Sequence, residues 1–204
     1  MGLQVRTQKV NIVSERFHTE RFNTPTGRML IVTDDEQRVR AADWEDKADR
    51  MQGLLRLHYG ENGFQLQERR TGSRARLALE AYFDGHLEAL DAIRTETRGT
   101  AFQRRVWVAL RDIPAGTTVS YGQLAAKIGR SAAVRAVGAA NGANPIPVVV
   151  PCHRVIGADA SLTGFGGGLE RKRWLLAHEG RHATTNNRVA RPPGAAYLRA
   201  PSRR

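Results

Sequence analysis

The first ninety residues alternate between short apolar runs and helical spacing. Apolar residues fill positions 29–32 and dominate 39–44, and a polar turn at 34–37 separates them, so the pattern predicts two strands. From about 46 to 59 the apolar positions recur every three or four residues, which predicts a helix. Alternation of apolar and polar residues from Phe64 onward predicts a third strand. Strands and helices in this order indicate a small α/β unit.

Turn and cap signals set the limits of this unit. Ser73 is suited to cap a helix that runs to Asp84, and Gly85 would terminate that helix. The residues before the first strand show no clear periodicity. We therefore predict an α/β N-terminal domain over residues 24–90, preceded by a polar arm over residues 1–23. The domain contains no obvious catalytic cluster.

Beyond a linker at 91–99, the pattern predicts a mainly helical C-terminal domain over residues 100–180. Thr100 is placed to cap its first helix, and Ser120 opens a short helix with a capping box. A turn containing glycine follows, and Ser131 is placed to cap the next helix. Helix, glycine turn and helix form the helix-turn-helix pattern, although many other helix corners share it.

The end of the chain changes in character. The last helix is predicted to begin at Leu169 and to end at Glu179–Gly180. Residues 181–204 contain no acid and few large apolar residues, so we predict a basic disordered tail. Two roles stay open for it: a solubilising extension, or a tether that raises affinity for DNA. It carries six arginines, Arg181, Arg188, Arg191, Arg199, Arg203 and Arg204.

Charge and composition narrow the class of protein. The 204 residues carry a formal charge of +12, of which the six arginines of the tail supply half, leaving 12 − 6 = +6 on residues 1–180. This balance favours a polyanionic partner, and nucleic acid is the first candidate. A single cysteine excludes an intrachain disulfide framework and a cysteine-rich metal cage. Without a long apolar run or an apolar leader, we expect a cytoplasmic protein that does not engage membranes.

The single cysteine is the strongest candidate for chemistry. Cys152 follows three valines, expected to form a short, buried, extended run, and Pro151 precedes it directly. A cysteine attacks carbon as a thiolate, and a nearby base or cation promotes its ionisation. His153 and Arg154 follow, so a base and a cation are at hand, with a water relay from thiol to imidazole and Glu179 as a candidate to orient the ring. The residues alone also allow a buried, unreactive cysteine.

Several longer strings around this cysteine match one family in order and spacing. They are Val150-Pro151-Cys152-His153-Arg154-Val155, Ser120-Tyr121-Gly122-Gln123-Leu124-Ala125, Arg135-Ala136-Val137-Gly138, Asn144-Pro145, Phe102-Gln103-Arg104-Arg105-Val106-Trp107 and Trp174-Leu175-Leu176-Ala177-His178-Glu179-Gly180. From about residue 24 to 180 the chain resembles the O6-alkylguanine-DNA alkyltransferases, and most of all their bacterial constitutive, single-module type.

The resemblance implies a fold and a reaction. The fold would be an α/β N-terminal ribonuclease-H-like domain plus a mainly α C-terminal domain with a winged helix-turn-helix. The partner would be double-stranded DNA that carries O6-alkylguanine. Cys152 would take the alkyl group from O6 of a flipped guanine, and from O4 of thymine as well, once per molecule. We expect no cofactor, no metal and a monomer in solution.

The resemblance also implies roles for single residues. His153 would accept the thiol proton through water, Glu179 would orient His153, and Tyr121 would donate a proton to the departing guanine. Arg135 would fill the place of the flipped base. The remaining assignments are DNA contacts by Ser120, Ala136 and Gly138, the hinge at Asn144, and a base pocket at Pro151, Val155 and Phe165.

Two features depart from the family's pattern. Many members have tyrosine and serine where this chain has Phe165 and Gly166, so the wall of the pocket loses a hydroxyl and the pocket gains space. The zinc ligands that some members carry in the N-terminal domain are missing here.

A lesion sensor without transfer activity and a sequence-specific regulator are the rival functions. The presence of Cys152 argues against the sensor.

Overall fold

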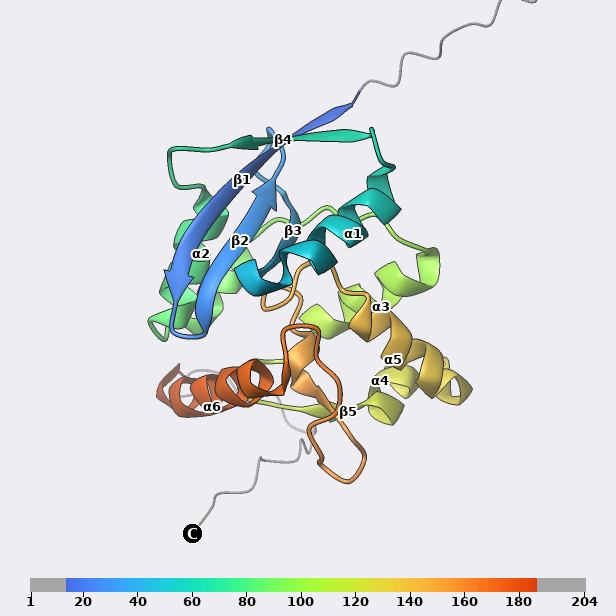
Figure 1. The fold of residues 1–204 in the computed structure, drawn as a ribbon. Helices are drawn as coiled ribbons and strands as arrows, with labels where there is room; N and C mark the ends of the chain where they lie inside the picture. Colours follow the sequence, from blue (N-terminus) through green and yellow to red (C-terminus); the bar gives the residue numbers. More distant parts are fainter. Residues whose placement is uncertain (1–13, 187–204) are drawn as a thin grey trace, which may run out of the picture.

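A mixed four-stranded sheet forms one end of the molecule (Figure 1). The computed structural model describes residues 14–186. The strand order is β3-β2-β1-β4: β1, β2 and β3 are antiparallel neighbours, and β4 is parallel to β1. The strands are β1 (Glu15–Thr24), β2 (Gly27–Thr33), β3 (Val39–Trp44) and β4 (Phe64–Glu68).

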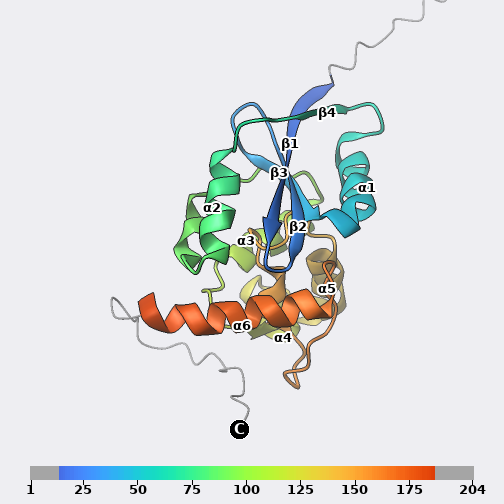
Figure 2. The same ribbon diagram turned by 60° about the vertical axis from the view of Figure 1, so that its left-hand side comes forward.

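Helices cover both faces of this sheet, as Figure 2 shows. Helix α1 (Ala48–Tyr59) follows the short 3-10 helix η1 (Glu45–Lys47) and packs Met51 and Leu55 against one face. Helix α2 (Arg74–Phe83) packs against the other face. The predicted cap of α2 is confirmed, because the Ser73 hydroxyl accepts a hydrogen bond from the backbone N–H of Arg76.

The second half of the chain is mainly helical, as predicted, and shares its core with the sheet. One continuous cluster of buried apolar residues includes Trp44 and Tyr82 from the first half and Leu110 and Leu175 from the second. Thr100 caps one of its helices and Ser120 opens another with a capping box, both as predicted, and Thr100 forms a capping box as well. The elements are η2 (Leu87–Ala92), α3 (Ala101–Arg111), β5 (Val119–Ser120), α4 (Tyr121–Lys127), η3 (Ser131–Ala133), α5 (Val134–Gly142), η4 (Cys152–Arg154), β6 (Val155–Ile156) and α6 (Leu169–Asn186).

The predicted polar arm over residues 1–23 is wrong for its second part. Residues 15–23 belong to β1, which lies inside the sheet between β2 and β4. Charged residues alternate with buried ones such as Phe17 and Phe22, and this mixture hides the strand from a search for apolar runs. Residues 1–13 lie outside the described part. The predicted linker at 91–99 begins inside η2 and then pairs with the sheet, because the Val39 N–H donates to the Arg94 carbonyl at 2.8 Å.

Three further expectations about the second half are wrong. Helix α6 continues through Glu179–Gly180 to Asn186, so residues 181–186 are helix rather than tail; residues 187–204 lie outside the described part. Ser131 does not cap α5, because a 3-10 turn intervenes and the N-cap is Ala133 without a side-chain bond. Residues 148–150 are buried as expected but form a turn rather than an extended run, and Val148 has a left-handed φ of 73°.

Within residues 14–186, no helix is both long and apolar enough to cross a membrane.

Candidate active site

Cys152 begins the 3-10 turn η4 between α5 and α6. Its side chain is buried, with 4% of the residue exposed. The Asn144 side-chain amide donates to Sγ at 3.1 Å. Burial raises the pKa of the Cys152 thiol, whereas the Asn144 hydrogen bond and the positive charges of Arg50 and Lys172 lower it. Burial is the largest of these effects, so the pKa of the thiol is raised overall, and the Asn144 hydrogen bond and the two positive charges limit that rise.

Asn144 is fully buried and uses its whole side chain. Its Oδ1 accepts from the Ile146 N–H at 3.0 Å, and its Nδ2 donates to the Val150 carbonyl at 2.8 Å as well as to the cysteine sulfur. Asn141, one turn earlier, donates to the Cys152 carbonyl at 3.4 Å. The end of α5 and the turn that carries the cysteine are thus tied together by two amide side chains, of which the sequence indicated only Asn144.

His153 and Glu179 form a fully buried pair. The distance from Nε2 to the Glu179 Oε1 is 2.8 Å, and both side chains have no exposed area. Burial lowers the pKa of His153, although Glu179 acts in the opposite direction. The other ring nitrogen, Nδ1, is buried and has no hydrogen-bond partner among the described residues. With Nε2 donating to Glu179, Nδ1 is a free acceptor, which is the form a general base requires.

Glu179 gathers donors from both halves of the chain. Its carboxylate accepts from the Tyr82 hydroxyl at 2.9 Å, from Arg154 at 2.8 and 2.9 Å, and from the Gly116 N–H at 3.1 Å. Burial alone would raise the pKa of Glu179, but His153 and Arg154 hold it well below its usual range. Burial raises the pKa of Tyr82 well above its usual value, and the neighbouring carboxylate adds to this. Glu179 is therefore an anion that fixes the imidazole.

Lys172 is a fully buried cation that the sequence analysis missed. Its Nζ donates to the carbonyls of Val155 at 2.6 Å and Thr163 at 2.7 Å, and burial lowers its pKa to about 8. It joins the segment after the cysteine to the glycine-rich loop. A signal was present: Lys172, Leu175 and Glu179 lie on one helical face, so the apolar stripe of α6 contains two charged residues.

Phe165 and Val155 contact different parts of the molecule. The Phe165 ring packs edge-on against His153, at 6.4 Å between ring centroids, and against Trp44 of the sheet, at 5.9 Å. Val155 is buried and pairs with Val119 in the short parallel ladder of β5 and β6. Pro151 is buried directly before the cysteine. Phe165 thus contacts the residue that follows Cys152, and the base pocket at Pro151, Val155 and Phe165 stays a prediction.

The predicted DNA contacts lie on a separate, exposed face formed by α4 and α5. Arg135 and Ala136 project from α5 to solvent, and Arg135 has no hydrogen bond or ion pair with any residue in 14–186. Tyr121 begins α4 and is half-buried, and Gly138 lies beside its ring, where an added Cβ would be in ordinary contact at 3.8 Å. Ser120 caps α4. No hydrogen bond between described residues joins these five predicted contact residues to Cys152, and the link from α5 to Cys152 is made by the buried Asn141.

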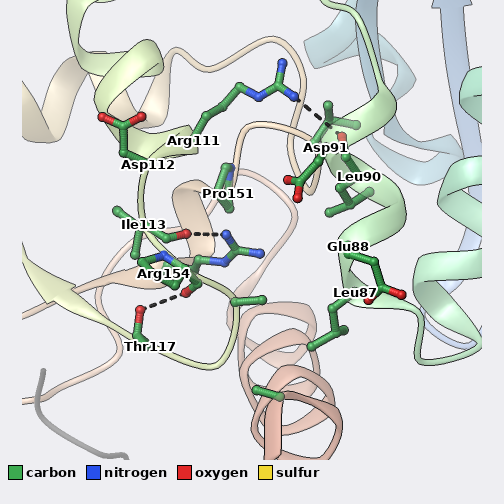
Figure 3. A pocket seen from close by; sticks show the side chains of 14 residues that line it. Leu87, Glu88, Leu90, Asp91, Arg111, Asp112, Ile113, Thr117, Pro151 and Arg154 are labelled. Carbon is green, nitrogen blue, oxygen red and sulfur yellow. Dashed lines mark hydrogen bonds between the residues drawn. The ribbon is translucent and has the colours of Figure 1, made fainter. Parts of the chain in front are cut away.

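A separate hollow of about 420 Å³ lies behind the catalytic turn (Figure 3). Pro151 and Arg154 form one wall, and residues of η2, among them Leu87 and Leu90, form another. Arg111 crosses it and donates to the Leu90 carbonyl at 3.5 Å. Cys152 does not line this hollow, so the hollow is separate from the site around the sulfur.

Within the described residues, no group of three histidine, cysteine or acidic side chains is placed to hold a metal ion.

Comparisons with known proteins agree with one another. Residues 101–181 match the family described as 6-O-methylguanine DNA methyltransferase, DNA binding domain. The methylated-DNA–protein-cysteine methyltransferase of Salmonella typhimurium is 51% identical over 165 residues, which are 81% of this chain and 96% of that protein. That of Shigella flexneri is 47% identical over the same shares.

Solved structures extend the likeness to the fold. The Mycobacterium tuberculosis protein OGT in complex with DNA is 36% identical, with a TM-score of 0.65, and the match covers 82% of this chain and 94% of that one. The O6-methylguanine-DNA methyltransferase of Pyrococcus kodakaraensis is 26% identical, with a TM-score of 0.58, over 80% of this chain and 99% of that one. These matches include the mixed sheet as well as the helical half.

Proposed function

Because this chain belongs to the methylated-DNA–protein-cysteine methyltransferases, we propose that it repairs DNA by moving the alkyl group from O6 of guanine onto Cys152. The observation that carries the assignment is the arrangement around the sulfur. Asn144 donates to Sγ, and the residue that follows the cysteine, His153, forms a buried pair with Glu179 and has Nδ1 free. A cysteine that was only a core residue would not require a buried base, acid and amide around it.

The transfer uses groups that the chain supplies itself. A water held by the unpartnered Nδ1 of His153 passes the thiol proton to the imidazole, and Glu179 stabilises the resulting cation. The thiolate attacks the alkyl carbon, the carbon–oxygen bond breaks, and Tyr121 donates a proton to the departing guanine, which is a poor leaving group as an anion. Cys152 keeps the group as a thioether. The same reaction takes an alkyl group from O4 of thymine.

The protein acts once and without a cofactor. A thioether is a poor leaving group, and the chain has no second cysteine that could take the group from Cys152. Each molecule therefore accepts one alkyl group. We propose that it works as a monomer in the cytoplasm.

DNA binding belongs to the exposed face of α4 and α5. We propose that these helices form a winged helix-turn-helix and that the sheet domain is ribonuclease-H-like, in keeping with its β3-β2-β1-β4 order. Arg135 enters the space that the flipped guanine leaves. The small residues Ala136 and Gly138 allow α5 to approach double-stranded DNA closely. Since Cys152 is buried, side chains around Phe165 have to move aside to admit the base.

Intact mass after incubation with methylated duplex DNA tests the proposal. We expect a gain of about 14 Da on Cys152 alone, complete at one lesion per protein, because the methyl replaces the thiol hydrogen. Cys152→Ala is the control and should gain nothing. An unchanged mass of the parent protein under saturating lesion would reject the transferase and favour the lesion sensor. A strong preference for one undamaged sequence would favour the regulator.

A further inference from the structure

An arginine of the N-terminal domain reaches into the hinge of the active site. Arg50 lies on α1, and its Nη2 donates to the carbonyls of Gly142 at 3.0 Å and Asn144 at 2.8 Å. Its Nη1 donates to the Asp43 carboxylate at 2.5 Å. The neighbouring Ala42 N–H donates to the Pro145 carbonyl at 2.9 Å. Three carbonyls of the segment 142–145 are thus held by the edge of the sheet and the first helix.

This contact is built rather than incidental. Asp43 is fully buried, and a buried carboxylate is stable only with a partner such as the Arg50 guanidinium. Burial raises the pKa of Asp43, and Arg50 counteracts that rise. The segment that Arg50 holds is the one from which the Asn144 side chain reaches Sγ. A movement of these carbonyls would therefore move the amide away from the sulfur.

Arg50 also fills the space beside Gly166. A Cβ added to Gly166 would lie 2.7 Å from both Cζ and Nε of Arg50, which is closer than packing allows. The guanidinium thus occupies the space that a side chain at position 166 would need, next to Phe165 of the proposed base pocket. The charge so placed acts on the sulfur, since Arg50 lowers the pKa of Cys152.

We propose that Arg50 is a positioning residue for alkyl transfer, holding the hinge that aims Asn144 at Cys152 and placing a positive charge near the thiolate. The proposal rests on the proposed function and gives the N-terminal domain a part in the reaction. It also explains the glycine at position 166: this chain keeps that position free for the guanidinium.

Single-turnover transfer from methylated duplex DNA, measured from pH 6 to pH 10, tests the proposal with three variants. Arg50→Ala should slow transfer at neutral pH roughly 10- to 100-fold, because the Asn144 amide is no longer held toward the sulfur and the positive charge that stabilises the thiolate is removed. Arg50→Lys keeps the charge but not the fork of donors, so it should restore the pH dependence and only part of the rate. Arg40→Ala removes a buried ion pair with Asp34 in the same domain without touching the hinge, and should transfer like the parent once folding is verified.

Reaction of Cys152 with iodoacetamide, in the absence of DNA, separates the charge from the fold. The chain has one cysteine, so the modification reports on that residue alone. The pH midpoint of the reaction should rise in Arg50→Ala and return in Arg50→Lys. A purely structural loss would slow the reaction equally at every pH and leave the midpoint unchanged, which would overturn the electrostatic half of the proposal.

Gly166→Ser offers a variant that retains Arg50 and displaces it. The added side chain should push the guanidinium from the hinge and shift the midpoint in the direction of Arg50→Ala, and the double variant should shift no further than Arg50→Ala alone. Gly53→Ser, on the same helix with open space around it, is the matched control. A transfer rate within twofold of the parent, together with an unchanged pH midpoint, in Arg50→Ala would overturn the proposal. Should the parent transfer no methyl group, the proposed function fails, while the iodoacetamide midpoints still decide the effect of Arg50 on the thiol.

Discussion

The buried site at Cys152 and the exposed face of α4 and α5 treat polar groups in opposite ways. Around the cysteine, side-chain amides, a carboxylate and two buried cations satisfy one another, and Glu179 alone accepts from four residues. On the exposed face, Arg135 has no hydrogen bond or ion pair with the described residues. Among the described residues of the first region, His153 Nδ1 and Asn141 Oδ1 are buried without a hydrogen-bond partner, whereas the second region leaves the guanidinium of Arg135 exposed to solvent.

This difference follows from what each region has to do. A reaction needs its groups fixed before the substrate arrives, because their reorganisation would raise the barrier. Recognition of a duplex needs free cations at the surface, because their pairing with phosphates or with the gap left by a base is the source of affinity. Substitutions should therefore act on reactivity and folding in the first region, and on affinity in the second.

The largest expected effect comes from Glu179→Gln. Removing the charge leaves Arg154 buried without its anion, which costs about 3–5 kcal/mol of unfolding free energy. It also removes the partner that fixes His153, so transfer should fall roughly 10²- to 10⁴-fold. Thermal unfolding and single-turnover kinetics measure the two losses. Glu170→Gln, on the same helix but with an exposed side chain, is the control and should change neither.

The same substitution has a pH signature in stability. The pKa of Glu179 is held below the unfolded value of 4.5, so its contribution is complete above that pH and is lost as the pH falls through the native pKa. The parent should therefore lose melting temperature on acidification more steeply than Glu179→Gln, and the two curves should converge. Parallel curves from pH 6 to pH 3 would show that the carboxylate contributes no linked stability.

A smaller effect is expected from Arg135→Ala on the exposed face. If Arg135 fills the gap left by the flipped base, its loss should lower the rate of transfer at subsaturating DNA roughly 5- to 150-fold, which corresponds to about 1–3 kcal/mol. The melting temperature and the iodoacetamide reactivity of Cys152 should stay unchanged, because Arg135 is exposed and has no hydrogen bond or ion pair within residues 14–186. Arg56→Ala, on α1 of the sheet domain, removes the same charge and is the control. Equal losses in both variants would reduce Arg135 to a general phosphate contact.

The sequence predicted the parts of the site that lie close together in the chain. The caps of α2, α3 and α4 depend on neighbouring residues, and the structure confirms them. Cys152 and His153 adjoin in the chain, so their roles could be inferred from the sequence, and these roles stay predictions. Gly180 was misjudged as a helix end because a glycine after a charged residue is a common stop signal. In the structure α6 continues, since its buried face extends past that residue to Ala183, which packs on the core.

The contributions of Arg50, Tyr82 and Lys172 were not predictable in the same way. Tyr82 meets Glu179 across 97 positions of sequence, and Arg50 meets Asn144 across 94. Such pairs exist only because the helices on the two faces of the sheet are packed against the catalytic half. Helical periodicity marks these residues as buried or amphipathic and says nothing of their partners. Lys172 is the exception, because a lysine in an apolar stripe is itself a signal of a buried acceptor.

The smallest expected effect concerns the basic segment after α6. The part to be removed begins after Asn186, because Ala183 of the preceding turn belongs to the core. Residues 187–204 hold five of the six arginines, Arg188, Arg191, Arg199, Arg203 and Arg204. If they act as a tether, truncation should leave transfer at saturating DNA unchanged and flatten the salt dependence of binding by about 0.9 in slope for each lost phosphate contact. A full-length chain with these five arginines changed to glutamine should behave like the truncation, because the effect arises from charge rather than length. An unchanged slope in both would assign the segment to solubility alone.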